Sequence, residues 1–241
     1  MAKKGTHYSG TAYAAPPDWP AVDKQILAWS NFMTDEAVSG RVITQVNHLT
    51  WLHRGVGRRV CKCFHFVPGD IDERVLPPPQ NDRITYILES AESLFAKGIA
   101  LHALQDAHTH RGFVGGWSKL NSRSQKSWWR AFLPDYCHTD MLDIPDKPNT
   151  EWSDNGVMVR NNERLLAALC QTARYLGSPV SRVYELNYQW NDGTPEQREA
   201  EWEKIAGVLP YDSIKDATWK KYGGDWEKAA VRQREALLET F

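Results

Sequence analysis

The chain lacks the long apolar runs that cross membranes: no stretch approaches the roughly 18 apolar residues that a spanning helix needs. Its start, MAKKGTHYSG, has a basic pair but no apolar segment behind it, so we expect no signal peptide of the usual kind. The formal net charge is only −1, which gives no bulk attraction to nucleic acid or to an anionic membrane. We therefore expect a protein that is cytoplasmic at synthesis, with export by a dedicated secretion system left open.

Cysteine is also scarce, with four residues in the whole chain. Cys61 and Cys63 are one residue apart, too close for an ordinary disulfide and without the two-residue gap of a zinc knuckle. We expect free thiols in a reducing compartment. The chain has enough histidine and aspartate that a metal site needs no cysteine.

Helical patterns dominate what is present. The chain has 241 residues, enough to bury a substantial core in one domain. Apolar residues recur at helical spacing in several segments, separated by long loops. The expected helices cover residues 18–40, 81–112, 156–177, 194–207 and 224–239, after an irregular lead-in over 1–17. We predict an all-α single domain with a central metal-bearing helix, in which 1–155 form a metal-binding catalytic core and 156–241 add C-terminal helices.

The segment ALHALQDAHTHRGF, residues 100–113, concentrates residues of metal-ligand type. His102, Asp106 and His110 are spaced four apart. Each step of four residues turns an α-helix by about 400°, so successive members drift by only about 40°. All three are predicted to share one helix face, which we call the ligand stripe, while His108 falls off it.

A carboxylate on such an apolar helix costs several kcal/mol to bury without a partner, and a divalent cation is a suitable partner. The alternative is a set of satisfied core histidines. Further candidates of ligand type occur in other segments: His7, Asp35, His48, His138, Asp140, Asp143 and Asp146. Imidazole together with carboxylate suits zinc, or less selectively manganese or iron. The absence of cysteine from the set is more typical of a catalytic site than of a structural one.

These motifs carry a family resemblance. LHALQDAHTH, with ligand-type residues before and after it, resembles the all-helical superfamily of zinc-dependent phospholipase C and the single-strand-specific zinc nucleases. The segments HY near the start, FHFVPG, HALQDAHTHRGF and PDKP are similar to a bacterial branch of that group. The resemblance covers roughly residues 5–155.

The resemblance implies two zinc ions, with a third as an alternative. Its implied ligands are Asp35, His48, His102 and Asp106 for one ion; His110, His138 and a carboxylate for a second; and Asp106 with His7 for a third. The family's carboxylate follows the last histidine by four residues, where this chain has Leu142, so Asp146 is preferred and Asp143 is the alternative. The family's N-terminal residue is itself a ligand, whereas this chain begins MAKKGTH.

The resemblance also implies an activity: hydrolysis of a phosphodiester, either a phospholipid head group or a nucleic acid, by a metal-bridged hydroxide. Asp35 is the implied catalytic base as well as a ligand. His65, between Phe64 and Phe66, is expected to be structural. Two alternatives remain open, a non-catalytic interaction protein stabilised by metal, which Leu142 favours, and an exported toxin-type effector that uses the same site.

Overall fold

The computed structural model describes residues 4–37, 39, 41–45, 59–115, 117–121, 135–136, 151–154, 157–189 and 195–241. Helices dominate these residues, which confirms the all-α prediction. The helical elements are η1 (Lys4–Gly10), α1 (Thr11–Ala14), α2 (Ala21–Glu36), η2 (Cys61–His65), α5 (Asp82–Glu89), α6 (Leu94–Thr109), η3 (Lys119–Asn121), α7 (Asn161–Tyr175), α8 (Val180–Gln189), α9 (Pro195–Ala206) and α10 (Tyr211–Leu238). Two short antiparallel pairs accompany them: β1 (Trp117–Ser118) with β2 (Asp135–Tyr136), and β3 (Glu151–Asp154) with β4 (Val157–Arg160).

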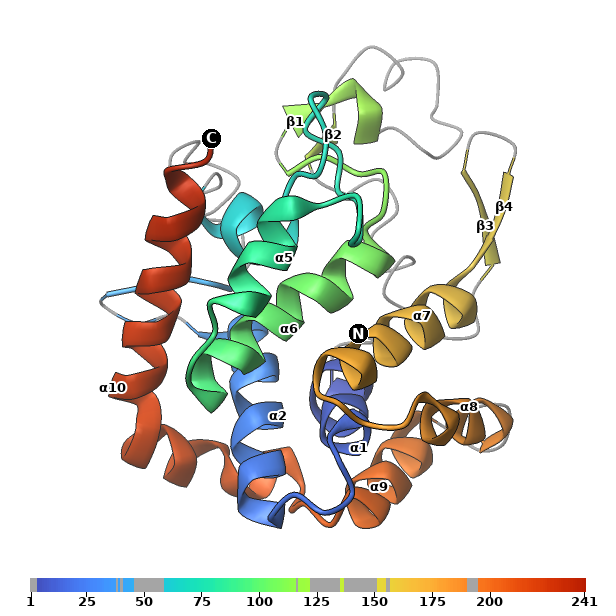
Figure 1. Ribbon diagram of the computed structural model, residues 1–241, viewed down its shortest axis with the longest axis vertical. Coiled ribbons are helices and arrows are strands. Elements are labelled where there is room, and N and C mark those ends of the chain that lie inside the picture. Colours follow the sequence, from blue (N-terminus) through green and yellow to red (C-terminus); the bar gives the residue numbers. More distant parts are fainter. Residues whose placement is uncertain are drawn as a thin grey trace.

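Helix α6 crosses the middle of the molecule (Figure 1). It packs against α2, α5, α7, α10 and η2. Most residues of α6 itself are small or apolar, and they lie on all sides of the helix. Such a helix is stable only when other elements cover it. The sequence of α6 therefore fixes its central position, and any polar side chain that it carries is buried as a consequence.

Helices α2 and α6 approach each other closely at Gly98. A Cβ atom at this position would lie 2.6 Å from the Cβ of Ser30 and 2.7 Å from the carbonyl oxygen of Leu27. Only glycine fits here without a shift of one helix. The contact sets α2 against α6 over the turns that carry the polar residues of both helices.

The predicted helix over 81–112 is two helices in the structure. Asn81 caps α5 by accepting a hydrogen bond from the backbone N–H of Ile84, and Ser93 caps α6 by accepting one from Ala96. The chain leaves helical geometry between Ser90 and Ser93. Ser93 provides a stronger start signal than the continuing apolar pattern, so the single long helix was a wrong prediction.

Several other boundaries differ from prediction: α10 begins at Tyr211 and not at residue 224, and α2 ends at Glu36 and not at residue 40. Residues 157–160 pair with 151–154 as a hairpin, so α7 begins at Asn161. The lead-in is not irregular: η1 and α1 are helical and largely buried, and they pack against α7 and α9. Helix α8, which the sequence analysis did not place, also packs against α1 and α7.

Two expectations about composition can be checked in the described part of the chain. Cys61, Cys63 and Cys170 are buried and belong to no disulfide among the described residues, and Cys137 lies outside those residues. None of the helices described here combines the length and the hydropathy that crossing a bilayer requires.

Candidate metal centre

Six ligand-type side chains from four elements converge on one face of α6. They are His7 from η1, Asp35 from α2, His65 from η2, His102 and Asp106 from α6, and His110 directly after α6. We call them the buried cluster. The side chains of its members are exposed by no more than 9 %. Groups this polar are rarely so buried unless another charge compensates for the lost hydration.

The ligand stripe predicted from the four-residue spacing is present. His102 Nε2 lies 3.2 Å from Asp106 Oδ2, and His110 Nδ1 lies 3.7 Å from the same oxygen. Gly112, with a φ of +88°, turns the chain after α6, and the His110 ring stacks on Phe66 at a centroid distance of 4.5 Å. His108 is off the stripe, as predicted, and pairs with Gln171 on α7 at 2.6 Å.

Asp35 faces the stripe from α2. Its Oδ1 lies 3.8 Å from His102 Nε2 and 3.9 Å from His65 Nδ1, and its Oδ2 lies 4.0 Å from His7 Nε2. Among the described residues, Oδ2 is buried without a hydrogen-bond partner. A carboxylate oxygen in this state is destabilised unless a cation or a proton compensates it.

His65 is a member of the cluster, although the sequence analysis expected only a structural role for it. Its Nδ1 lies 2.9 Å from Asp106 Oδ2 and 3.0 Å from His102 Nε2. Its phenylalanine neighbours, Phe64 and Phe66, had indicated that this segment packs in the core. In the structure, η2 is a π-helical turn, a geometry that is frequent at functional sites. This backbone aims the His65 ring at α6, and the local motif FHFVPG was the only sequence signal for it.

His7 approaches Asp106 as expected. Its Nε2 lies 3.3 Å from Asp106 Oδ1, the oxygen that does not face His65 and His102. Element η1 is also π-helical. The two cluster histidines that do not belong to α6 or its end, His7 and His65, therefore both come from π-helical turns. The two oxygens of the Asp106 carboxylate thus face different histidines: Oδ1 faces His7, and Oδ2 faces His65 and His102.

Two ligand groups can be assigned on this basis. One comprises His65, His102 and Asp106, and the other comprises His7, Asp35 and His102; within each, the ligand atoms lie within 4.8 Å of one another. Both aspartates divide their oxygens between the two sides, so they are suited to bridging two cations. His102 offers the same nitrogen to both groups and can bind only one cation at a time.

The outer nitrogens of three rings face oxygen acceptors. His65 Nε2 donates to the carbonyl oxygen of Thr44 at 2.8 Å, while the Nδ1 atoms of His7 and His102 face Gln105 Oε1 and Asn31 Oδ1. A neutral imidazole that donates from its outer nitrogen presents a lone pair from its inner nitrogen. The inner nitrogens of His65 and His102 are only 3.0 Å apart, a separation that requires a proton or a cation between their lone pairs.

The pKa values show where protons lie in the absence of a cation. Burial lowers the pKa of His65, but the hydrogen bond and charge of Asp106 outweigh burial and raise it to about 9. Burial and the neighbouring His7 lower the pKa of His102 to about 4. Burial opposes ionisation of Asp106, but the surrounding imidazoles hold its pKa well below the usual value. Asp106 is therefore ionised at neutral pH, and its negative charge attracts a proton or a cation to the cluster.

Five candidate ligand residues cannot be placed. They are His48, His138, Asp140, Asp143 and Asp146, which lie outside the residues that the structure describes. His65, which the sequence analysis left out of the ligand set, lies beside His102 and Asp106. Of the predicted set, the structure brings together His7, Asp35, His102, Asp106 and His110.

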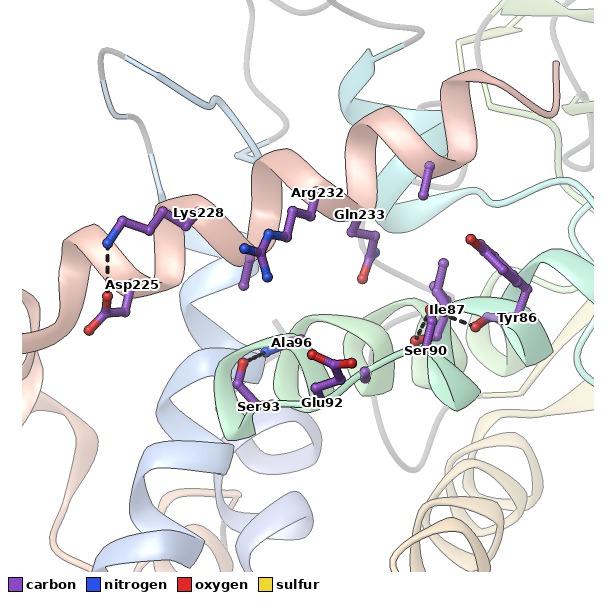
Figure 2. Close-up of a pocket in the computed structure, with 13 residues that line it drawn as sticks. Tyr86, Ile87, Ser90, Glu92, Ser93, Ala96, Asp225, Lys228, Arg232 and Gln233 are labelled. Atoms are coloured by element: carbon purple, nitrogen blue, oxygen red, sulfur yellow. Dashed lines mark hydrogen bonds and ion pairs between the residues drawn. The ribbon is translucent and has the colours of Figure 1, made fainter.

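A separate groove of about 480 Å³ lies between α10 and the α5–α6 turn. Figure 2 shows Lys228 and Arg232 on α10 opposite Glu92 and Ser93 at the start of α6. No member of the buried cluster lines it among the described residues. The groove therefore supplies surface residues for control substitutions that leave the cluster intact.

The family described as "Family of unknown function (DUF6765)" matches residues 18–239. The chain belongs to the DUF6765 family. The DUF6765 match spans five of the six cluster residues, from Asp35 to His110, and begins after His7. No curated protein and no solved structure matches the chain. The description of DUF6765 assigns no activity, and the basis for a function is the geometry of the cluster.

Proposed function

We propose that this DUF6765 protein is a metal-dependent hydrolase that acts on a phosphodiester, with zinc as the metal. The observation that carries the proposal is the convergence of three imidazole nitrogens on two buried aspartates. Mixed nitrogen and oxygen donors without cysteine are the chemistry of catalytic zinc sites. The orphaned oxygen of Asp35 and the close pair of nitrogens on His65 and His102 both fit a bound cation.

The residues divide into two sets around the bridging aspartates. His65, His102, Asp35 Oδ1 and Asp106 Oδ2 would hold one zinc ion, and His7, Asp35 Oδ2 and Asp106 Oδ1 would contribute to a second. When bound, such ions act as Lewis acids on a phosphoryl group and supply a nucleophile from water at neutral pH. His110 stands beside Asp106, on the side where the family resemblance expects a further zinc ion.

The charge of the loaded cluster would attract the substrate, and a carboxylate of the chain would accept the proton of the attacking water. Two divalent cations exceed the charge of two aspartates, so the loaded cluster would attract a phosphodiester anion. Asp35 is the candidate proton acceptor: its Oδ2, which no described donor occupies, would serve when this carboxylate holds zinc through Oδ1 alone. A phospholipid head group and a nucleic acid both carry this phosphodiester, and the activity screen below distinguishes them.

The test compares a zinc-loaded wild type with Asp106→Asn on four substrates: a chromogenic phosphodiester, phosphatidylcholine vesicles, single-stranded DNA and RNA. Asp225→Asn is the matched control, since Asp225 pairs with Lys228 on the surface of α10. We expect hydrolysis of at least one substrate, a loss of about 100-fold or more in Asp106→Asn, and wild-type activity in Asp225→Asn. Hydrolysis of none of the four by protein shown to contain zinc would contradict the proposal.

One observation favours a second candidate, a metal that only stabilises the fold. The cluster is almost completely buried, and structural zinc sites are closed. In that case zinc would raise the melting temperature of the wild type and not of Asp106→Asn, while no substrate would be cleaved. The screen and the melting curves together separate the two candidates.

A further inference from the structure

Gln105, one residue before Asp106 on α6, is completely buried and all four hydrogen-bonding positions of its amide are used. Its Oε1 faces His7 Nδ1 at 2.8 Å and accepts from Asn31 Nδ2 at 3.2 Å. Its Nε2 donates to the hydroxyls of Thr11 at 2.8 Å and Thr172 at 3.1 Å. The amide thus joins η1, α1, α2 and α7 behind the ligand stripe.

Two hydroxyls fix which way this amide points. Thr172 Oγ1 donates its hydrogen to the carbonyl oxygen of Ala168 at 2.9 Å, and Thr11 Oγ1 donates to that of Thr6 at 3.5 Å. Since a hydroxyl has one hydrogen, both can only accept from Gln105. The nitrogen of the amide must face the threonines, and its oxygen must face His7.

Asn31 on α2 is oriented in the same way. Its Nδ2 donates to Thr11 Oγ1 at 3.0 Å and to Gln105 Oε1. The carbonyl oxygen of the Asn31 amide is then left for His102 Nδ1, at 3.3 Å. Both amides therefore offer acceptors to the outer nitrogens of two cluster histidines.

We propose that Gln105 and Asn31 are positioning residues that fix the tautomers of His7 and His102. With a hydrogen held on each Nδ1, both rings direct an Nε2 lone pair toward the aspartates, which is the form that binds a cation. An amide rotated by half a turn would place N–H groups against His7 and move its hydrogen onto Nε2. The inference rests on the proposed function only in assuming that the cluster binds a metal ion.

Zinc affinity tests the proposal, measured by competition with a fluorescent chelator on the full chain. Replacing an outer acceptor of a metal-bound histidine typically weakens binding 10- to 100-fold, and we expect this loss for Gln105→Leu. Gln105→Glu keeps an acceptor for His7 and is expected to stay within about ten-fold of wild type. Gln171→Leu is the matched control, because it removes the same type of bond from His108, which is outside the cluster.

The tautomer itself gives a readout that loss of packing alone would not change. Nitrogen-15 NMR of histidine-labelled, zinc-loaded protein is expected to show His7 and His102 protonated on Nδ1 in wild type and in Gln171→Leu. If Gln105→Leu does not fold, Thr172→Val replaces it. This variant removes one anchored acceptor of the amide nitrogen and is expected to show a mixed His7 tautomer with affinity weakened several-fold.

Wild-type zinc affinity in Gln105→Leu, or a loss no larger than that of Gln171→Leu, would overturn the proposal. So would a His7 that keeps its hydrogen on Nε2 in zinc-loaded wild type. Failure of the hydrolase proposal gives a different result, since zinc binding would still depend on Gln105 while no phosphodiester is cleaved. Absence of zinc binding in wild type would overturn both.

Discussion

Asp106 is the residue on which the cluster depends. Four imidazoles lie around its carboxylate: those of His7 on η1, His65 on η2, His102 on α6, and His110 directly after α6. An aspartate this deeply buried would be strongly destabilising without compensating charge. The surrounding histidines compensate it by holding protons or, as we propose, by sharing a cation with it.

His65→Ala and His108→Ala form a matched pair that tests membership of the cluster. Both histidines are largely shielded from solvent, but only His65 faces Asp106. We expect His65→Ala to weaken zinc binding by at least about 100-fold, because it removes a ligand and not an outer partner. His108→Ala is expected to bind like wild type, and equal losses in the two variants, measured by chelator competition, would contradict the assignment.

The raised pKa of His65 makes the metal-free protein sensitive to pH. Its contribution to stability is complete below the ordinary histidine pKa of 6.5 and is lost as pH rises through about 9. His7 acts in the same direction, because the two aspartates outweigh its burial and raise its pKa as well. The pKa of His102 is lowered to about 4, so His102 titrates below this window. In EDTA, the free energy of unfolding is expected to fall by on the order of 3 kcal/mol between about pH 6 and about pH 9.5.

Urea denaturation at the two pH values measures this change. The same comparison on His65→Gln provides the control, and a smaller pH dependence is expected there, with the part due to His7 remaining. Metal-free wild type that is as stable at the higher pH as at the lower one would show that His65 holds no extra proton.

At the scale of residues, the sequence predicted five of the six cluster residues as ligands and missed His65. The four-residue spacing of His102, Asp106 and His110 suffices to place them together on a helix. His65 could not be placed in the same way, because a π-helical turn has no strong sequence pattern and its phenylalanine neighbours suggested packing. The positions of His7 and Asp35 followed from the family resemblance and not from periodicity.

At the scale of elements, the contact between α2 and α6 holds the two aspartates in register. Asp35 lies on α2 and Asp106 on α6, and Gly98 permits the close approach of these helices. Relative displacement of the helices would separate the carboxylates before it disturbed either helix alone. Metal affinity should therefore report on this packing.

Gly98→Ala tests the coupling. The added Cβ would overlap Ser30 and Leu27, so we expect a loss of about 1–3 kcal/mol in the free energy of unfolding together with weaker zinc binding. Gly224→Ala on α10 is the control, because nothing lies within 4 Å of its added Cβ. That variant is expected to gain up to about 1 kcal/mol from helix propensity.

Urea denaturation and chelator competition on both glycine variants give the two quantities. If Gly98→Ala is as stable and binds zinc as tightly as Gly224→Ala, the close approach of α2 and α6 does not position the cluster.

Local signals predicted some element boundaries, but the cap at Ser93 was missed and other boundaries depend on tertiary contacts. Pro195 does begin α9, as its place after Thr194 predicted. The lead-in was predicted to be irregular because 4–14 show little periodicity, yet this segment is helical and buried beneath α7 and α9. Burial on all sides removes the periodic signal from which an isolated amphipathic helix is recognised.

At the scale of the whole molecule, the cluster joins parts of the chain that are distant in sequence. Its residues span positions 7 to 110, and the network behind them reaches Thr172 on α7. A cation bound there would stabilise only the folded state, because the unfolded chain does not hold the ligands together. Metal binding is thus expected to stabilise the entire fold and not a single loop.

Removal of metal should accordingly lower the melting temperature. At a free zinc concentration about 100 times the dissociation constant, binding adds about 2.7 kcal/mol, equivalent to roughly 5–10 °C for a chain of this size. Calorimetry in EDTA and in zinc measures the shift, with Asp106→Asn as the control that should show little change. Identical melting temperatures of wild type in the two buffers would be incompatible with zinc binding by the folded cluster.

Anomalous diffraction at the zinc edge, on crystals of the zinc-loaded protein, tests the central claim most directly. The account predicts a peak at about 2.0–2.2 Å from His65 Nδ1, His102 Nε2 and an oxygen of Asp106. A map without a peak among these atoms, or with zinc bound only at surface groups such as those of the α10 groove, would contradict it.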